Sequence, residues 1–468
     1  MSLQVYNTLT RKIEPFIPIE KGKVKIYICG MTVYGDMHIG HARTYVAFDV
    51  ILRFLKYKGY ELSYVQNITD VDDKIVNKAA ELGVEPSDLS EKFALRSKED
   101  QEALGLLDPD KFPKVSENIS EIISAVQKLI DGGSAYEAEG DVYFDISSSA
   151  SYGSLSNQDL EQINERRIES DENKRNPSDF SLWKSRPKDE FGYESPWGWG
   201  RPGWHIECSV MSQKFLGDQI DIHGGALDLI FPHHENEIAQ SEALTSKEPF
   251  VRYWIHTGFL NSSGEKMSKS LGNILPVREF LEKFDANVFR LFILQTKYRS
   301  PIDYSEDQIK AAASSLEKLK NFKKEMSTAL NKDRFGESQD ATSLGNKLIE
   351  SFNKHMDNDF DSSNAIASIY EFVREMNTLI RNGSESKESL SQALTTFEEV
   401  VLVLGISIEV TEDIALTEKD KKLIEERNRY RAEKNWKEGD RIRDEFQKRG
   451  LKLVDKKDGT TGVEPIKE

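Results

Sequence analysis

A strand, a glycine-bearing loop, a helix and a second strand follow one another near the N-terminus, and this order constrains the fold most. Residues 23–28 alternate apolar and polar side chains, which predicts a β-strand. Residues 42–58 carry apolar side chains at three- and four-residue steps, which predicts a helix that Gly59 ends. Residues 61–69 predict a second strand. Because a strand–helix–strand unit places its strands in parallel, we expect an α/β domain with a parallel sheet.

The loop before this helix carries Cys29 at its start and the tetrad His38-Ile-Gly-His41 at its end. Cys29 and Thr69 would both stand at C-terminal ends of parallel strands, the edge where open α/β sheets bind ligands. Backbone N–H groups and the helix dipole at such a place attract phosphate. An isolated His-x-x-His is more often an ordinary loop, so its meaning depends on the rest of the chain. The acidic stretch 70–74 that follows either starts a helix or contacts a substrate.

Composition and periodicity divide the rest of the chain. An amphipathic helix over 116–131 opens a segment of short β runs and polar loops, which interrupts the α/β pattern as an insertion. Helical periodicity over 305–404 predicts a bundle. A basic helix with interleaved aromatics over 423–449 and a short strand over 451–454 predict a small mixed α/β domain. That helix could contact RNA, although a charged, exposed face is the more common meaning. We expect a Rossmann-like catalytic domain in two halves (1–114 and 201–260), with the insertion at 115–200, a lysine-loop region at 261–310, the bundle at 311–406 and the last domain at 407–468.

The chain has 468 residues and a net charge of −17, which argues against a surface that binds nucleic acid through overall basicity. An enzyme that binds RNA through a local basic patch remains compatible with it. The sequence has no apolar run of membrane-spanning length and no secretory signal pattern, so we expect no membrane contact and a cytoplasmic location.

The two cysteines, Cys29 and Cys208, are either buried thiols or metal ligands, since nothing indicates the secreted setting that favours a disulfide. Seven of the eight histidines fall in the first 256 residues together with both cysteines, which favours metal binding. His233 and Glu237 are four residues apart on a helix predicted to open near residue 228, so they share one helix face. Zinc prefers thiolate, imidazole and carboxylate ligands. The predicted ligands are Cys29, Cys208, His233 and Glu237, with His234 and Glu235 as rivals from the same helix.

A second motif lies between glycines at 264–272 and carries Lys266 and Lys269 with two serines. Alone, it fits a solvated surface loop as well as a phosphate-binding one. Lysines on a mobile loop can supply counter-charge as phosphate chemistry proceeds. Its occurrence about 225 residues after the histidine tetrad makes the pair of motifs much more specific than either alone.

Together, His38-Ile-Gly-His41 and Lys266-Met-Ser-Lys-Ser270 resemble the HIGH and KMSKS signatures of class I aminoacyl-tRNA synthetases. Three further stretches resemble the cysteinyl-tRNA synthetase family: the cysteine before Gly-Met-Thr-Val-Tyr, the run Arg-Pro-Gly-Trp-His-Ile-Glu-Cys208, and Phe-Pro-His-His-Glu-Asn-Glu237. The resemblance extends over nearly the whole chain and is strongest in residues 1–310.

The resemblance implies a ligase that activates L-cysteine with ATP, accompanied by Mg²⁺, and transfers it to the 3′ end of tRNA-Cys. His38 and His41 would stabilise the transition-state phosphate, and Lys266 and Lys269 would neutralise the departing pyrophosphate. Gly40, Asp228 and Lys269 are expected to bind ATP, and Gly30, Thr32, Thr69, Trp204 and His223 to surround the amino acid. The chain is expected to act as a monomer.

One Zn²⁺ per chain would then select the substrate. A hydrophobic pocket separates such similar side chains by only about 10–200-fold, whereas a soft thiolate differs from a hydroxyl in its affinity for zinc. No editing domain is therefore expected.

The C-terminal domain would read the anticodon, and 261–310 would contact the tRNA stem. The positions that match the family's contacts are Arg431, Trp436, Asp440 and Asp455. Gly462 stands where family members often have tryptophan. Two alternatives remain: a zinc-dependent cysteine ligase of low-molecular-weight thiol biosynthesis, and a non-catalytic RNA-binding relative.

Overall fold

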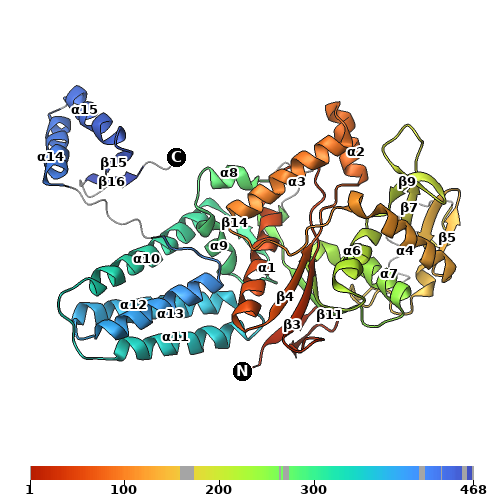
Figure 1. Ribbon diagram of the computed structural model, residues 1–468, viewed down its shortest axis with the longest axis horizontal. Coiled ribbons are helices and arrows are strands. Elements are labelled where there is room, and N and C mark those ends of the chain that lie inside the picture. The colour runs from red at the N-terminus through yellow and green to blue at the C-terminus, as the bar shows by residue number, and fades with distance from the viewer. Residues whose placement is uncertain are drawn as a thin grey trace. The chain divides into compact units, whose positions relative to one another are not determined.

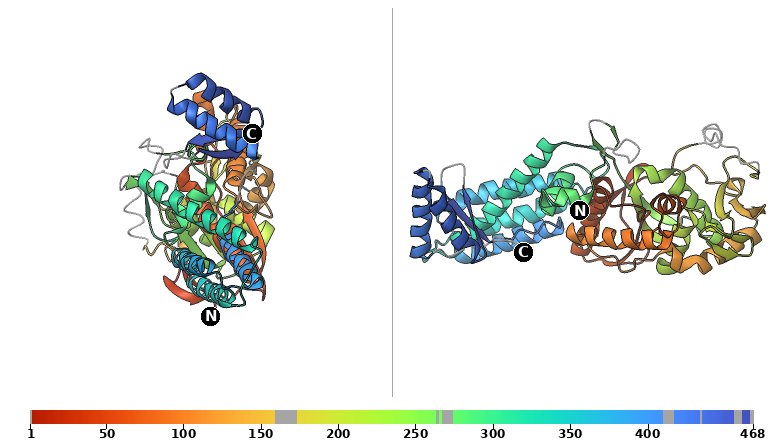
Figure 2. Two further views of the ribbon diagram at one scale, coloured as in Figure 1. Left: turned by 90° about the vertical axis from the view of Figure 1, so that its left-hand side faces the viewer. Right: turned by 90° about the horizontal axis from the view of Figure 1, so that it is seen from above.

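The computed structural model describes residues 2–158, 173–262, 265–266, 274–409, 417–433, 435–455 and 461–465. The chain forms two compact units, Met1–Ser407 and Ile408–Glu468. Within the first unit, a helical bundle and a sheet-containing insertion lie at opposite ends, with a parallel sheet between them (Figures 1 and 2).

A four-stranded parallel sheet forms the centre of the first unit. Its order is β11-β10-β3-β4, and every neighbouring pair is parallel. The strands are β3 (Lys23–Ile28), β4 (Glu61–Gln66), β10 (Ile220–Ala226) and β11 (Val251–Thr257). Helix α1 (Ile39–Tyr57) connects β3 to β4 and is largely buried. The predicted parallel strand–helix–strand unit is confirmed.

The loop after β3 continues alongside the segment after β4. Thr32 and Thr69 form a parallel bridge, and the backbone N–H of Val33 donates to the carbonyl of Thr69. Gly30 makes this approach possible, because a Cβ there would lie 1.7 Å from the carbonyl oxygen of Asn67. The sheet therefore extends its C-terminal edge into the loop that holds the predicted site residues.

The acidic stretch after β4 starts a helix, as one of the two interpretations predicted. Asp72 is the N-cap of α2 (Asp73–Leu82), and its carboxylate accepts from the N–H of Lys74. Helix α3 (Pro86–Ala103) follows.

In the described parts of the insertion, the α-helix α4 packs with a five-stranded antiparallel sheet of order β5-β6-β7-β9-β8. Its elements are η1 (Val115–Asn118), α4 (Ile119–Asp131), β5 (Ala135–Ala138), β6 (Asp141–Phe144), η2 (Ile146–Ser148), β7 (Phe180–Ser185), β8 (Tyr193–Ser195) and β9 (Gly198–Pro202). The chain then returns to the parallel sheet through α6 (Ile206–Leu216).

The helix predicted to open near residue 228 begins later. After β10, the chain forms the short helical turns η3 (Leu227–Leu229) and η4 (Ile230–His234), and α7 covers Glu235–Thr245. Phe231 has extended dihedrals (φ −135°, ψ 131°). It precedes Pro232, and a residue before proline disfavours the helical region.

The remaining elements of the first unit include the N-terminal hairpin and the bundle. They are β1 (Gln4–Asn7), β2 (Lys12–Pro15), β12 (Leu260–Ser262), β13 (Glu265–Lys266), α8 (Val277–Leu281), α9 (Ala286–Leu294), β14 (Ile302–Tyr304), α10 (Glu306–Leu330), α11 (Asp340–Met356), α12 (Ser362–Asn382) and α13 (Lys387–Val403). Apolar side chains on one face of each long helix fill the bundle core.

The second unit corrects the expected single helix over 423–449. It contains two helices, α14 (Glu418–Ala432) and α15 (Trp436–Gln447), and the hairpin β15 (Leu451–Asp455) and β16 (Thr461–Pro465). A small core unites side chains from both helices and the hairpin, namely Ile424, Ile442, Phe446 and Leu453. Ile424 and Phe446 would lie far apart along one continuous helix. Burial of both side chains in one core therefore favours a break between α14 and α15.

We expect Thr417→Ala to destabilise α14 by about 1 kcal/mol, because Thr417 and Asp420 form a capping box at its start. Hydrogen exchange of the α14 amides in the full chain would measure this loss. Unchanged protection would contradict the role of the cap.

None of the helices in the described parts of the chain is both long and apolar enough to cross a membrane.

Candidate active site

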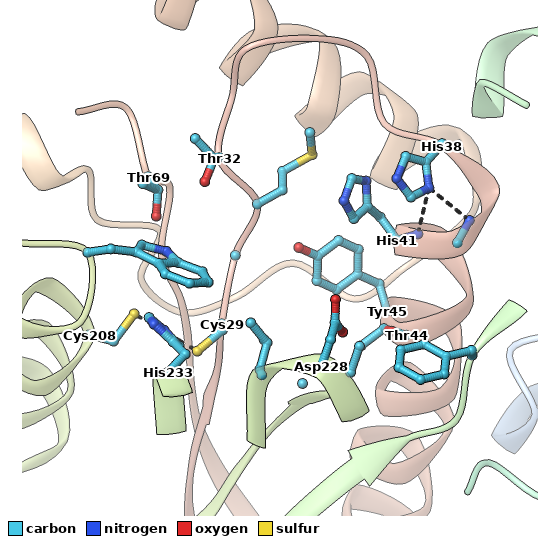
Figure 3. Close-up of a pocket in the computed structure, with 18 of the residues that line it drawn as sticks. Cys29, Thr32, His38, His41, Thr44, Tyr45, Thr69, Cys208, Asp228 and His233 are labelled. Atoms are coloured by element: carbon cyan, nitrogen blue, oxygen red, sulfur yellow. Dashed lines mark hydrogen bonds between the residues drawn. The ribbon is translucent and has the colours of Figure 1, made fainter. Parts of the chain in front are cut away.

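A cavity of about 260 Å³ opens at the C-terminal edge of the parallel sheet. Eleven predicted site residues line it, from the loop after β3, the start of α1, the segment after β4, the entry to α6 and the segment after β10 (Figure 3). They are Cys29, Gly30, Thr32, His38, Gly40, His41, Thr69, Trp204, Cys208, Asp228 and His233. The two thiols and His233 lie toward one end of the cavity, and His38 and His41 lie toward the other (Figure 3).

The thiol end brings the four predicted metal ligands together. Cys29 follows β3, Cys208 stands in the first turn of α6, and His233 and Glu237 flank the start of α7. All four side chains are buried, and their ligand atoms lie within 4.8 Å of one another. The Sγ atoms of Cys29 and Cys208 are 3.9 Å apart, Cys29 Sγ is 3.6 Å from Glu237 Oε1, and His233 Nε2 is 3.0 Å from Glu237 Oε1.

These distances fit a four-coordinate metal. Zinc binds sulfur at about 2.3 Å and nitrogen or oxygen at about 2.0–2.2 Å, so a tetrahedral site holds its ligand atoms about 3.3–3.8 Å apart. The other carboxylate oxygen of Glu237, Oε2, is buried; it lies 3.4 Å from His223 Nε2 and completes no hydrogen bond with any described residue. His233 Nδ1 lies 2.9 Å from His205 Nδ1, a contact of the kind that orients metal-binding imidazoles.

The structure also shows where the side chains of the two rival ligands, Glu235 and His234, point. Glu235 accepts from the backbone N–H groups of Leu155 and Ser156, so it points away from the thiols. His234 points toward them, with Nε2 3.3 Å from Cys29 Sγ. It belongs to a second possible metal-binding group that shares Cys29 and Glu237 with the first and adds His223. One ion can use the shared pair at a time.

His223 lies beside Cys29, with Nε2 3.4 Å from the Sγ atom, and does not belong to the described lining of the cavity. Burial lowers its pKa to about 4 and lowers the pKa of His256 to about 3. His256 Nε2 is 2.8 Å from His234 Nδ1. These histidines are therefore neutral near pH 7 and form a polar layer beneath the thiol end.

The pKa values of the side chains in the cluster shift in different directions. Burial raises the pKa of Cys29. Burial also opposes ionisation of Cys208, but the hydrogen bond from Cys29 and the interactions with His233 together outweigh it and lower the pKa of Cys208. Burial alone would lower the pKa of His233, but the Glu237 carboxylate and Cys208 outweigh it and raise the pKa to about 10. His233 is therefore the side chain of the cluster that carries a positive charge near pH 7.

The histidine end is organised by a helix cap. His38 is the N-cap of α1, and its Nδ1 accepts from the N–H groups of Gly40 and His41 at 3.1 and 3.3 Å. The His38 side chain thus accepts from the two N–H groups that the sequence offers for phosphate, and the expected phosphate contact there stays a prediction. Since Nδ1 accepts, the proton of a neutral His38 lies on Nε2. The His41 ring stacks on His38 with centroids 3.7 Å apart.

Asp228 lies on η3, next to the second half of the sheet, and lines the cavity near Tyr45 (Figure 3). Gly258, Phe259 and Leu260 line the cavity at the entry to β12. Lys269 falls outside the described residues. Lys266 is described only by its backbone in β13, where it pairs with Asn261.

The predicted tRNA contacts lie in the second unit. Arg431 and the buried Arg427 both pair with the carboxylate of Asp455, at 2.9 and 2.7 Å. The Trp436 side chain is 57% exposed, and the Arg431 guanidinium lies 5.9 Å from its ring. Asp440 follows Trp436 by one helical turn and pairs with Arg443 at 3.3 Å.

Two further charged residues line the cavity: Lys74, from the stretch 70–74 that was left open between a helix start and a substrate contact, and Glu207, which sequence reasoning missed. The Lys74 ammonium lies 5.8 Å from the Trp204 ring centroid. Glu207 accepts a hydrogen bond from the Thr69 hydroxyl at 2.6 Å. Burial, with a contribution from Cys208, raises the pKa of Glu207. Its place beside Cys208 was the available signal in the sequence.

Two family models match the chain. That for "tRNA synthetases class I (C) catalytic domain" matches residues 15–314, and that for "DALR domain" matches residues 351–409. Proteins named cysteine–tRNA ligase match over nearly their full length. The one from Carboxydothermus hydrogenoformans is 47% identical, covering 97% of this chain and 98% of that protein. The one from Thermococcus gammatolerans is 45% identical, covering 98% of each.

Solved structures of class I enzymes share the fold at low identity. Mycobacterium tuberculosis methionyl-tRNA synthetase in complex with methionyl-adenylate has a TM-score of 0.62 at 18% identity, covering 82% of this chain and 89% of that one. Agrobacterium radiobacter LeuRS in a ternary complex with tRNA and LeuAMS has a TM-score of 0.64 at 12% identity, covering 84% and 86%. The predicted α/β fold with its helical C-terminal region is confirmed.

Proposed function

Since the chain belongs to the cysteine–tRNA ligase family of class I aminoacyl-tRNA synthetases, a family that joins cysteine to tRNA at the expense of ATP, we propose how its cavity divides this work. The thiol end receives the side chain of L-cysteine, and the histidine end receives the phosphates of ATP. The observation that carries the proposal is the presence of both residue sets on one cavity (Figure 3).

The proposed metal is one Zn²⁺ per chain, held by Cys29, Cys208, His233 and Glu237. The spacing of their ligand atoms and the incomplete hydrogen bonding of Glu237 support this choice. When bound, zinc supplies a soft Lewis acid that favours the thiolate of cysteine over the hydroxyl of serine.

The residues at the other end would serve activation. His38 can donate from Nε2, because its Nδ1 accepts a hydrogen bond as the N-cap of α1. The His41 ring stacks on the His38 ring and lines the same end of the cavity. As the cysteine carboxylate attacks the α-phosphate, these imidazoles would stabilise the charge that develops on phosphate oxygens. Lys266 and Lys269 would neutralise the pyrophosphate, Gly40 would line the phosphate site and Asp228 would bind the ribose. Mg²⁺ would enter with ATP.

Gly30, Thr32, Thr69 and Trp204 line the cavity between the two ends and would surround the amino acid. His223 would act from beneath Cys29 rather than by contact with the substrate. In this proposal 261–310 contacts the tRNA stem and 407–468 reads the anticodon of tRNA-Cys. We further propose a monomer that acts in the cytoplasm, where it would find tRNA and free cysteine.

Two linked assays test the function. Cysteine-dependent exchange of pyrophosphate into ATP should occur without tRNA, and charging of tRNA-Cys should follow. Exchange without charging would identify a cysteine ligase that acylates another acceptor, and no exchange would identify a binding role. The chain matches cysteine–tRNA ligases over nearly their full length, and this match does not favour either alternative.

Trp436→Ala should lower kcat/KM for tRNA-Cys charging about 5- to 150-fold, because base stacking on an exposed aromatic contributes about 1–3 kcal/mol. Pyrophosphate exchange should stay unchanged. Asp444→Asn, an exposed change on the same helix, serves as the control. Equal charging by the two variants would contradict a role of Trp436 in tRNA binding.

A further inference from the structure

Arg43 is a buried cation on α1 that forms no ion pair with any acidic side chain among the described residues. It stands two residues after His41 and is 1% exposed. Its Nη2 atom donates to the backbone carbonyl of Tyr298 at 3.2 Å and to that of Ser300. Its Nε and Nη1 atoms are buried and complete no hydrogen bond with a described residue. Burial lowers the pKa of Arg43 to about 10, so the guanidinium stays charged near pH 7.

A role in stability alone explains this arginine poorly. Removing a charge from water is costly unless an opposite charge and further hydrogen bonds compensate for it. Arg43 does not belong to the described lining of the cavity, whereas His41 does. Residues two apart on an α-helix project about 200° apart, so Arg43 and His41 extend from nearly opposite sides of α1. The contacts that Arg43 makes are therefore with the backbone turn at 298–300, away from the reacting groups.

This turn lies directly against the rim of the cavity. The N–H of Gly258 donates to the carbonyl of Tyr298 at 2.9 Å. A Cβ at Gly258 would lie 2.6 Å from the carbonyl oxygen of Ser300, so the two backbones are in contact. Gly258 and the two residues after it line the cavity. Arg43 thus connects α1 to the backbone that forms this part of the rim.

A small sheet leads from the turn to the first lysine of the lysine motif. Its order is β13-β12-β14. Strand β14 begins two residues after Ser300 and lies parallel to β12. Strand β12 pairs antiparallel with β13, where Asn261 is opposite Lys266. The hydrogen bonds of Arg43 therefore join the helix that begins at the histidine tetrad to the sheet that carries Lys266.

A second contact attaches the turn to the helical bundle. The Tyr298 hydroxyl donates to Oδ1 of Asp359, and Nε of Arg299 donates to Oδ2, both at 2.8 Å. Asp359 lies between α11 and α12 and is 8% exposed. Because the bundle fixes the turn, Arg43 holds α1 against an element that has little freedom to move.

We propose that Arg43 is a positioning residue for cysteine activation, and that it sets the distance between the histidine pair at the start of α1 and Lys266 on β13. In the proposed function, the histidines stabilise charge on the α-phosphate while Lys266 neutralises the pyrophosphate. Both groups must then be aligned in one transition state. A misplacement of about 1 Å can cost about 100-fold in rate. This inference rests on the proposed roles of these residues.

Arg43→Met removes both hydrogen bonds and keeps an unbranched side chain. We expect kcat for cysteine-dependent pyrophosphate exchange to fall about 10- to 100-fold. The KM for cysteine and the zinc content should stay close to wild type, because Arg43 contacts no residue of the thiol end among the described contacts. Arg43→Lys keeps a charge and a donor, so it should recover part of the loss.

Arg290→Met is the matched control. Arg290 is also a buried arginine bound to α1, through the carboxylate of Asp49 and the carbonyl of Leu104, and its described contacts do not include the turn at 298–300. In denaturant unfolding, this variant should be less stable than wild type, without a comparable loss of kcat. Equal losses of kcat in Arg43→Met and Arg290→Met would show a purely structural effect and overturn the proposal.

Lys266→Ala tests whether Arg43 acts through the lysine. In a Lys266→Ala background, Arg43→Met should lower kcat by less than about threefold, because changes that act through one interaction are not additive. Losses that multiply would overturn this inference and leave the proposed function intact. No exchange by the wild type would refute the proposed function itself. If Arg43→Met does not fold, Arg43→Lys takes its place in the same double-variant test, with the same outcomes.

Discussion

Cys208→Ser is expected to remove bound zinc and cysteine-dependent pyrophosphate exchange together. Cys208 is 1% exposed, and its Sγ atom lies 3.9 Å from that of Cys29 within the four-ligand cluster. A serine hydroxyl is a harder and less acidic donor, so it replaces a thiolate poorly at a soft metal. Loss of a residue that only supports a ligand costs about 10–100-fold in metal affinity. Loss of a ligand should exceed that range.

The measurement combines metal analysis with exchange kinetics for cysteine and serine. Ser212→Ala is a matched control, because Ser212 lies on the same helix and bonds to the carbonyl of Ser209, outside the cluster. It should retain zinc and exchange. A zinc-free wild-type preparation that still prefers cysteine fully over serine would refute zinc-based selection. Zinc retained at one ion per chain by Cys208→Ser would refute its assignment as a ligand.

Gly30→Ala should destabilise the first unit and abolish cysteine activation. A Cβ at this position would lie 1.7 Å from the carbonyl oxygen and 2.7 Å from the carbonyl carbon of Asn67. The obstacle is backbone, so the loop must separate from the segment after β4 and lose the hydrogen bond from Gly30 N–H to Asn67 Oδ1. We expect a loss of about 3 kcal/mol, the upper end of ordinary overpacking costs.

Denaturant unfolding and the rate of cysteine-dependent pyrophosphate exchange would measure the two effects. Gly345→Ala offers a contrast, because a Cβ there would meet its nearest atom at 3.5 Å, within the interior of α11. It should leave activity unchanged and stabilise that helix by about 0.5–1 kcal/mol. If Gly30→Ala were as stable and active as Gly345→Ala, the close approach of the two segments would be wrong.

Patterns that depend on neighbouring residues were predictable. Alternation at 23–28 and the apolar stripe of α1 reflect the geometry of single elements, and both elements form as predicted. The break between α14 and α15 was not predicted, although Asn435 at the break and Gly439 after it are poor helix formers. Burial of Ile424 with Phe446 is a tertiary demand that local propensity does not contain.

For the cavity, too, some features were predictable from the sequence and others required the structure. Residue chemistry and motif spacing were enough to name both cysteines, both tetrad histidines and the partners of a soft metal. Side-chain direction required the structure. Glu235 turns to the backbone of the insertion, His234 turns to Cys29, and the His38 Nδ1 accepts from the backbone N–H of Gly40.

The opening motif illustrates what each level decides. The sequence by itself determined that a thiol and two histidines follow the first strand of a parallel sheet, because periodicity sets the strand and the side chains set the chemistry. Only the tertiary structure decided that these groups share one cavity with Cys208 and with the carboxylate of Glu207. Those contacts join residues more than a hundred positions apart, and they form because packing of the whole sheet and its helices brings distant segments to one edge.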